Sequence, residues 1–198
     1  MVNKSIVFLL VILLFSCTAR LSPLEYKAWL EDPENGLLQE TKKSGLTVKA
    51  FYRPQTYLVL NDLGLESLSD SSIATMKKEY AGIQYYELVI SMDSSDFIKG
   101  YSRDKNDYMN NLYYFTFAFQ KDISLIYPGI DTIPVNLYHF ERSYGMSYSK
   151  KFLIGFEDNK HKGDRLLHID SPLLPTGVIN VCFDATNIDK ASAIEIKI

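Results

Sequence analysis

The sequence predicts a single β-rich α+β domain over residues 23–198, mainly an antiparallel β-sandwich, immunoglobulin-like in outline, with two short helices. Short segments alternate apolar and polar side chains with a period of two, which is typical of half-buried strands. Glycine, proline, asparagine and aspartate stand at the ends of these segments, as they do in turns. With 46% hydrophobic and 13% aromatic residues, the composition is that of a globular chain and not of a disordered one.

The first expected helix has a clear start signal. Residues 22–25, Ser-Pro-Leu-Glu, form a capping-box pattern with proline at the first helical position. Tyr26, Trp29 and Leu30 then share one helix face. The turn residues within 32–36 end this element.

The middle of the chain is expected to alternate strands with one further helix. Residues 47–53 alternate in the manner of a strand, and Pro54 ends it because proline has no backbone N–H to donate. Residues 57–60 are expected to form the next strand. Residues 71–81 have an amphipathic helical pattern, and Gly82 suits the end of that helix.

An aromatic row gives the strongest strand pattern in the chain. It follows a strand expected at residues 85–92 and a polar stretch at residues 93–111. The row has a period of two and consists of Tyr113, Phe115, Phe117 and Phe119. Further strands are expected at residues 135–142, 151–156, 177–184 and 193–198.

The N-terminal residues have the composition of an export signal. Lys4 supplies a positive charge, and residues 6–15 are an unbroken apolar run. A membrane-spanning helix needs ~20 apolar residues, so this run favours a signal peptide over a permanent span. We expect a signal peptide over residues 1–16 and a short tether over residues 17–22.

Residues 14–17, Leu-Phe-Ser-Cys, resemble the lipobox of bacterial lipoproteins, although Phe15 departs from the usual small or branched residue at its position. The resemblance implies cleavage between Ser16 and Cys17. It also implies lipid attachment at Cys17, where a diacylglyceryl group joins the thiol and an acyl chain such as palmitate joins the new amino group. Two or three such chains hold a protein firmly, since each buried methylene contributes ~0.8 kcal/mol.

The alternative is an ordinary secretory signal with a cysteine at its cleavage site. Cys182 lies in an apolar run and is interpreted as a small buried hydrophobe, not as a disulfide partner of Cys17. Residues 29–37, behind the lipobox-like segment, loosely resemble uncharacterised envelope lipoproteins of Bacteroidota. That resemblance, with Thr18 where some inner-membrane lipoproteins have a retention aspartate, implies a lipid-anchored place in the cell envelope, at the outer membrane.

Charge and motifs exclude several functions. After removal of residues 1–16 the chain has 20 basic and 24 acidic residues and no basic cluster, which argues against nucleic-acid binding. His139, His161 and His168 do not form a metal-binding spacing, so we expect no metal and no other cofactor. No nucleophile elbow or phosphate-binding glycine loop is present in the sequence, and we expect no catalytic residues.

Three functions remain open. The leading hypothesis is a non-catalytic binding or structural accessory module, anchored to the membrane by lipid and contacting an envelope protein partner. The second is a surface binder of glycan or peptide, and the third is a hydrolase with a site built from dispersed residues. The polar segments 93–111 and 157–170 are where function is most expected. Within the first, the candidate interface residues are Phe97, Tyr101, Arg103 and Tyr108.

Overall fold

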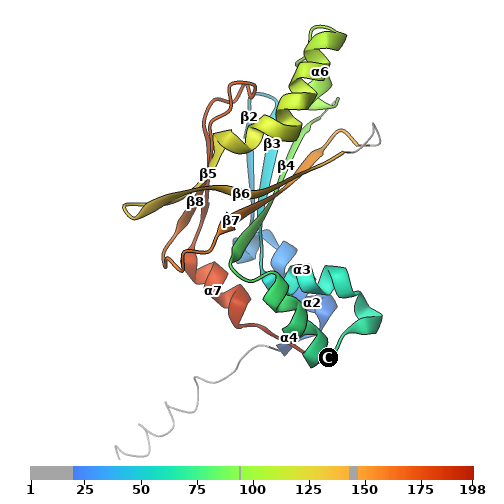
Figure 1. Cartoon of the computed structure of the whole chain (residues 1–198), viewed down its shortest axis with the longest axis vertical. Helices are drawn as coiled ribbons and strands as arrows, with labels where there is room; N and C mark the ends of the chain where they lie inside the picture. Colours follow the sequence, from blue (N-terminus) through green and yellow to red (C-terminus); the bar gives the residue numbers. More distant parts are fainter. Residues whose placement is uncertain (1–19, 94, 143–146) are drawn as a thin grey trace, which may run out of the picture.

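A computed structural model describes residues 20–93, 95–142 and 147–198, and it confirms a β-rich α+β fold (Figure 1). Eight strands form one sheet in the order β2-β3-β4-β7-β6-β5-β8-β9, and all neighbours are antiparallel. The strands are β2 (Leu38–Lys43), β3 (Leu46–Arg53), β4 (Ile83–Met92), β5 (Ile123–Tyr127), β6 (Asp131–Glu141), β7 (Lys150–Glu157), β8 (Arg165–Ile169) and β9 (Ile179–Phe183). A separate parallel pair joins β1 (Arg20–Leu21) to β10 (Glu195–Ile196).

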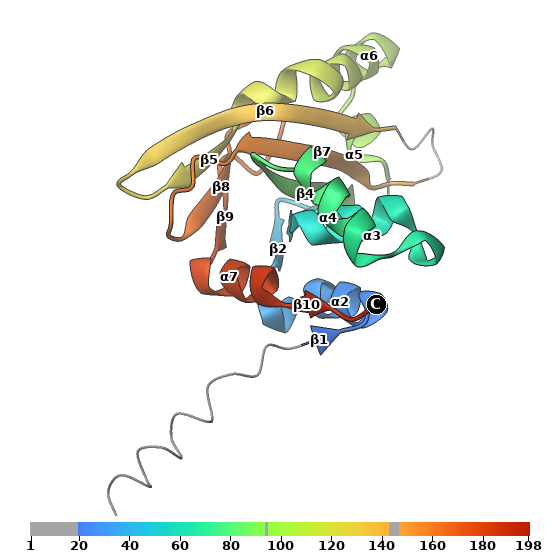
Figure 2. The ribbon, with the colours of Figure 1, turned by 60° about the horizontal axis from the view of Figure 1, so that its bottom comes forward.

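Six α-helices lie within the described residues, where the sequence predicted two. They are α2 (Pro23–Glu31), α3 (Gln55–Leu63), α4 (Asp70–Glu79), α5 (Phe97–Gly100), α6 (Lys105–Tyr113) and α7 (Ala185–Ala193). Helices α2, α3, α4 and α7 gather at one end of the sheet, together with the C-terminus, whereas α6 lies at the opposite end (Figures 1 and 2). No helix in the described ranges has the length and apolar character that crossing a bilayer requires.

The sheet curls until it is nearly barrel-shaped, and its concave face holds the core. Tyr86 on β4 and Phe183 on β9 are far apart in the strand order, yet their ring centroids lie 5.2 Å apart. At the sheet edges, Lys43 Nζ donates to the carbonyl of Val178 at 3.5 Å. The expected immunoglobulin-like sandwich of two sheets is therefore corrected to one curled sheet, because alternation along strands does not reveal how the strands are ordered.

The first helix confirms its sequence prediction. Ser22 Oγ accepts from the backbone N–H of Glu25 at 3.3 Å, and Glu25 Oε2 accepts from the Ser22 N–H at 2.8 Å. Tyr26 and Leu30 are fully buried, and the Tyr26 hydroxyl donates to the Ala191 carbonyl on α7. The capping box thus starts α2, and the buried face joins it to the C-terminal helix. Helix α4 likewise confirms the prediction for residues 71–81.

The aromatic row is helical and not a strand. Its residues fall in α6, the π-helical turn η3 (Tyr114–Ala118) and the 3₁₀ turn η4 (Phe119–Asp122). Phe115 and Phe119 are buried, while Tyr113 and Phe117 are exposed. An aromatic at every second position satisfies a period near four as well as a period of two, so the pattern alone cannot distinguish the two structures.

Three further predictions are corrected. Residues 57–60 belong to α3, where Tyr57, Val59 and Leu60 are buried on a helix that begins after Pro54. The polar stretch 93–111 contains α5 and α6 instead of an open loop, since aspartate side chains cap both helices. The last expected strand is limited to the two residues of β10, since only Glu195 and Ile196 pair with β1. Strands β5 and β8 were not predicted.

Cys182 is also placed differently from its prediction. It is a free cysteine and is exposed on β9, between the buried side chains of Val181 and Phe183. Its apolar neighbours suggested burial, but strand alternation turns every second side chain outward.

Candidate functional site: a polar cavity between the sheet and the helices

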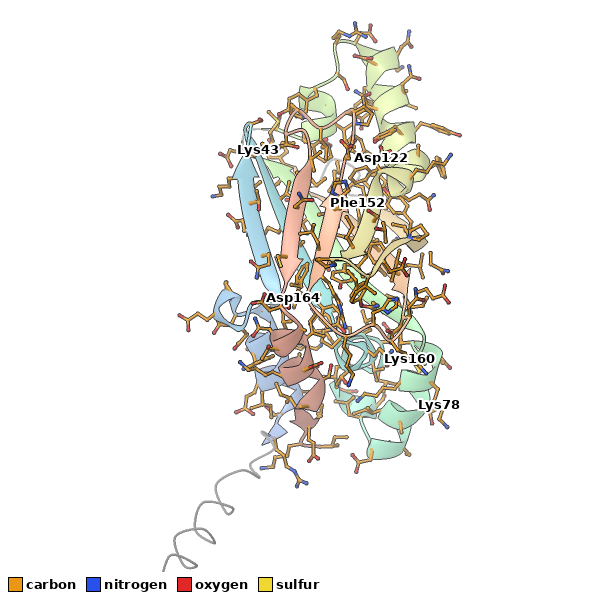
Figure 3. The ribbon with its side chains drawn as sticks, turned by 90° about the vertical axis from the view of Figure 1, so that its left-hand side faces the viewer. Lys43, Lys78, Asp122, Phe152, Lys160 and Asp164 are labelled. Carbon is orange, nitrogen blue, oxygen red and sulfur yellow. The ribbon has the colours of Figure 1, made fainter. Side chains whose placement is uncertain are left out.

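A cavity of about 300 Å³ lies where the end of the curled sheet meets helices α3, α4 and α7. Tyr52, Gln84 and Arg165 line it from strands, and Lys77 and Asp189 line it from helices. Asp158 adds a carboxylate from the segment that joins β7 to β8. Figure 3 shows Lys160 and Asp164 of this segment at the junction of sheet and helices.

Arg165 is the central residue of this site. It is the first residue of β8 and shares a strand face with Leu167 and Ile169, which are fully buried in the core. Its guanidinium carbon lies 5.7 Å from the ring centroid of Tyr52 and 5.6 Å from that of Tyr127. The alternation of β8 therefore turns a cation toward the inside of the sheet, among tyrosine rings.

Four polar atoms around Arg165 are buried and complete no hydrogen bond within the described part of the chain: Nε and Nη1 of Arg165, Nε2 of Gln84 and the Tyr86 hydroxyl oxygen. The other end of the Gln84 amide is satisfied, since Oε1 accepts from the Tyr127 hydroxyl at 3.1 Å. Gln84 is only 5% exposed. Three of the four atoms are obligate donors, and Arg165 faces the neutral hydroxyl oxygens of Tyr52 and Tyr86, so the site lacks a charged acceptor.

The cavity also holds charges without a counterion, although Arg53, which lines it too, pairs with Glu87 Oε2 at 2.8 Å. Lys77, Asp158, Arg165 and Asp189 all line it. Among the described residues, no ion pair within 4 Å joins any of these four to another charged side chain. A buried donor without a partner costs ~1–3 kcal/mol, and more when it is charged. Holding these donors inside the fold is therefore costly, which is typical of a binding site and not of a structural core.

Burial controls the protonation of the surrounding groups. It raises the pKa of Tyr52 and Tyr86, so both hydroxyls stay protonated at neutral pH and can donate hydrogen bonds. Burial lowers the pKa of Lys77 on the opposite wall. The sheet side of the cavity thus offers hydrogen-bond donors, while the carboxylates of Asp158 and Asp189 offer acceptors elsewhere on its wall.

Part of this site lies in a segment where the sequence predicted function. Asp158 and Arg165 fall in the polar segment 157–170, where function was expected. Tyr52 and Gln84 were missed, because a glutamine or tyrosine in a strand gives no signal until the sheet brings it beside an unpaired charge. An arginine at the start of an apolar strand was the signal that could have found Arg165.

The four candidate interface residues have different surroundings. Phe97 is 1% exposed, and its ring packs on Phe115 at 5.0 Å, so it is a core residue. Tyr101 and Tyr108 are half-buried. Arg103 is exposed, and its Nε donates to Asp107 Oδ2 at 2.9 Å. Of the four, only Arg103 is exposed and so accessible to a partner.

An exposed apolar stripe on α6 and η3 was missed. Met109, Tyr113 and Phe117 lie four residues apart and are 53%, 66% and 54% exposed. The rings of Tyr113 and Phe117 lie 5.0 Å apart. We call these three residues the α6 stripe. A helical interpretation of the aromatic row would have revealed it, because residues four apart share a helix face.

The histidines do not assemble a recognisable centre. His139 is exposed on β6, His168 Nδ1 lies 2.8 Å from Asn180 Oδ1, and His161 Nε2 lies 3.3 Å from Asp131 Oδ2. Neither of these contacts includes a serine. Within the described ranges, no group of three or more histidine, cysteine, aspartate or glutamate side chains could hold a metal ion.

The lipid-attachment prediction lies outside the described residues. Cys17 and the Ser16 to Cys17 cleavage site both precede Arg20, where the described chain begins. Arg20 itself lies in β1, paired with Glu195 of β10, at the helical end of the molecule.

Comparisons with known proteins leave the family open. No protein-family model matches the chain, and no curated protein matches it in sequence. A crystal structure of a protein from Burkholderia pseudomallei, described as novel and of unknown function, aligns over 89% of this chain and 96% of its own, at 10% identity and a TM-score of 0.39. A TM-score of this size supports no argument about fold or function.

Proposed function

We propose that this protein is a lipid-anchored envelope protein that acts as a non-catalytic binding module and holds a small polar ligand in the cavity around Arg165. One observation carries the proposal: an arginine whose Nε and Nη1 are buried lines a polar cavity and has no ion-pair partner among the described residues. A ligand with a carboxylate would supply both the missing acceptor and the missing charge, since arginine and carboxylate match in geometry.

Binding is tested with a series of simple carboxylates. The mature protein is titrated with acetate, propionate and lactate, while its thermal unfolding midpoint is followed. We expect at least one of them to raise the midpoint of the wild type, because a ligand that binds only the folded state stabilises it. The same compound should leave Arg165→Met unchanged. An equal rise in both proteins would refute a site at Arg165.

The anchor is proposed from the lipobox-like segment and is tested by substitution. A Cys17→Ala variant should stay unprocessed or be released as soluble protein. Detergent-phase partitioning measures this, and unchanged partitioning would reject the lipid anchor. Cys182→Ala is the matched control, because Cys182 is an exposed free thiol on the folded domain and its loss should leave partitioning unaltered. Membrane fractionation tests the outer-membrane location.

A partner protein at the α6 stripe is the second candidate function. Its three apolar side chains are more than half exposed, and helix α6 lies at the end of the molecule opposite the C-terminus (Figure 1). Exposed contiguous apolar surface is typical of interaction sites. A double variant, Tyr113→Ser with Phe117→Ser, should abolish crosslinking to an envelope protein in intact cells. Crosslinks that persist in this variant would place the partner elsewhere.

A further inference from the structure

The charged groups of the cavity come from different walls. Arg165 and Gln84 belong to the sheet, whereas Asp189 belongs to α7 and Asp158 to the segment after β7. The buried donors without partners are all on the sheet side, and Lys77 adds one cation from α4. The cavity is therefore lined by groups of opposite character on different elements.

The sheet side requires an anion and not merely a neutral acceptor. A carbonyl oxygen would satisfy one N–H group, but it would leave the guanidinium charge without a counterion. Arginine keeps its charge in proteins, so the charge cannot be relieved by deprotonation. A carboxylate satisfies two N–H groups at once and neutralises the charge.

The acidic side should weaken the binding of a simple anion without preventing it. Within the described residues, the Asp158 side chain accepts one hydrogen bond, from the Lys160 N–H to Oδ1 at 3.1 Å. Asp189 is exposed on α7 and forms no hydrogen bond or ion pair within the described part of the chain. An anion alone would lie in one small cavity with these two carboxylates and be repelled by them. A ligand that also carries an ammonium group would turn that repulsion into attraction.

We propose that the cavity takes a small zwitterion, whose carboxylate lies against Arg165 and Gln84 and whose ammonium group lies toward Asp158 and Asp189. This assignment names the ligand class and rests on the proposed binding function. The volume of about 300 Å³ is at the small end of ligand pockets, which run from ~300 to 1,000 Å³. An amino acid or a dipeptide fits this size, and an oligosaccharide does not.

The experiment separates the two ends of the ligand. The mature protein is titrated by calorimetry with alanine, with alanyl-alanine, and with two truncated probes: propionate, which lacks the ammonium group, and ethylamine, which lacks the carboxylate. At least one zwitterion should bind about 10- to 100-fold more tightly than either truncated probe, the loss expected when one charge-assisted contact is missing.

Variants assign each end to its residues. Arg165→Met should weaken zwitterion binding by about 10-fold or more, and so should Asp189→Asn and Asp158→Asn, since each removes one charged partner. Asp170→Asn is the matched control, because this exposed acid lies outside the cavity and its loss should not change binding. The thermal midpoint of each variant confirms that it is folded.

The outcomes distinguish this inference from the proposed function. If propionate binds as tightly as the zwitterions, or if neither aspartate variant changes binding, the zwitterion is wrong but a carboxylate site at Arg165 stands. If inorganic phosphate alone binds, the site takes an anion only, and the zwitterion is again rejected. If no probe binds in a manner that depends on Arg165, both proposals fail.

Discussion

Replacing Arg165 with methionine should make the ligand-free protein more stable, although it removes the central residue of the cavity. The methionine side chain has a similar length and no polar hydrogen, so it can pack among Tyr52, Tyr86 and Tyr127. Replacing a buried charge with an apolar residue of similar volume is often neutral or stabilising. Binding sites commonly carry such a cost in stability.

The size of the effect follows from the contacts of the guanidinium. Two of its nitrogens, Nε and Nη1, are buried without partners, and at ~1–3 kcal/mol each their removal gains about 2–6 kcal/mol. Two contacts with tyrosine rings are lost, at ~0.5–1 kcal/mol each. The net gain is about 0–5 kcal/mol. For a chain of this size, each kcal/mol raises the unfolding midpoint by about 2–4 °C.

The assay is thermal and urea unfolding of the wild type and the variant, both without ligand. Arg53→Met is the comparison variant. Arg53 also lines the cavity and its Nη1 is buried without a hydrogen bond, but it has an ion-pair partner: its Nη2 donates to Glu87 Oε2 at 2.8 Å, and its guanidinium lies 3.7 Å from the Phe51 ring centroid. That variant should lose about 1–3 kcal/mol, because Glu87 is left unpaired. A destabilised Arg165→Met protein would refute the argument that Arg165 lacks a partner.

Two further predictions concern the sheet and the α6 region. Gly155→Ala should lower the unfolding free energy by about 1–3 kcal/mol. The added Cβ would lie 2.8 Å from Ile83 Cγ2 and 2.9 Å from Leu137 Cβ, which is too close. An unchanged urea midpoint would contradict this packing. Arg103 hydrogen bonds hold the pKa of Asp107 at about 2, and Arg103→Ala should raise it toward ~3.9, as carboxyl-carbon NMR titration measures. Because the folded pKa is depressed, the stability contributed by Asp107 is present above about pH 4 and is lost as the pH falls toward 2. An unmoved titration midpoint would show that Arg103 is not the cause.

The elements with local signals were predicted well. The capping box at Ser22 and Glu25 specifies the start of α2 from within four consecutive residues, and β3 and β4 follow from alternation along single strands. The strand predicted for the aromatic row was wrong for a physical reason. Aromatic residues at every second position fit a strand with a period of two and a helix with a period near four. Burial against the sheet distinguishes the two, because it covers Phe115 and Phe119 and leaves Tyr113 and Phe117 exposed.

The candidate site was only partly predictable. Asp158 and Arg165 lie in a segment whose polarity pointed to function, but the sequence contains nothing that links them to Gln84 or Asp189. These residues belong to different strands and helices, and their proximity depends on the curl of the sheet and on the docking of α7.

The sequence by itself determined the β-rich class, the first helix and a lipobox-like N-terminus, because each depends on residues that are neighbours along the chain. Only the tertiary structure decided that the sheet is single and curled, that the aromatic row is helical, and that Arg165 lines a polar cavity with no counterion among the described residues. These features arise from contacts between residues far apart in the sequence. Local periodicity carries no information about such contacts, since it records which side of an element is buried and not what it is buried against.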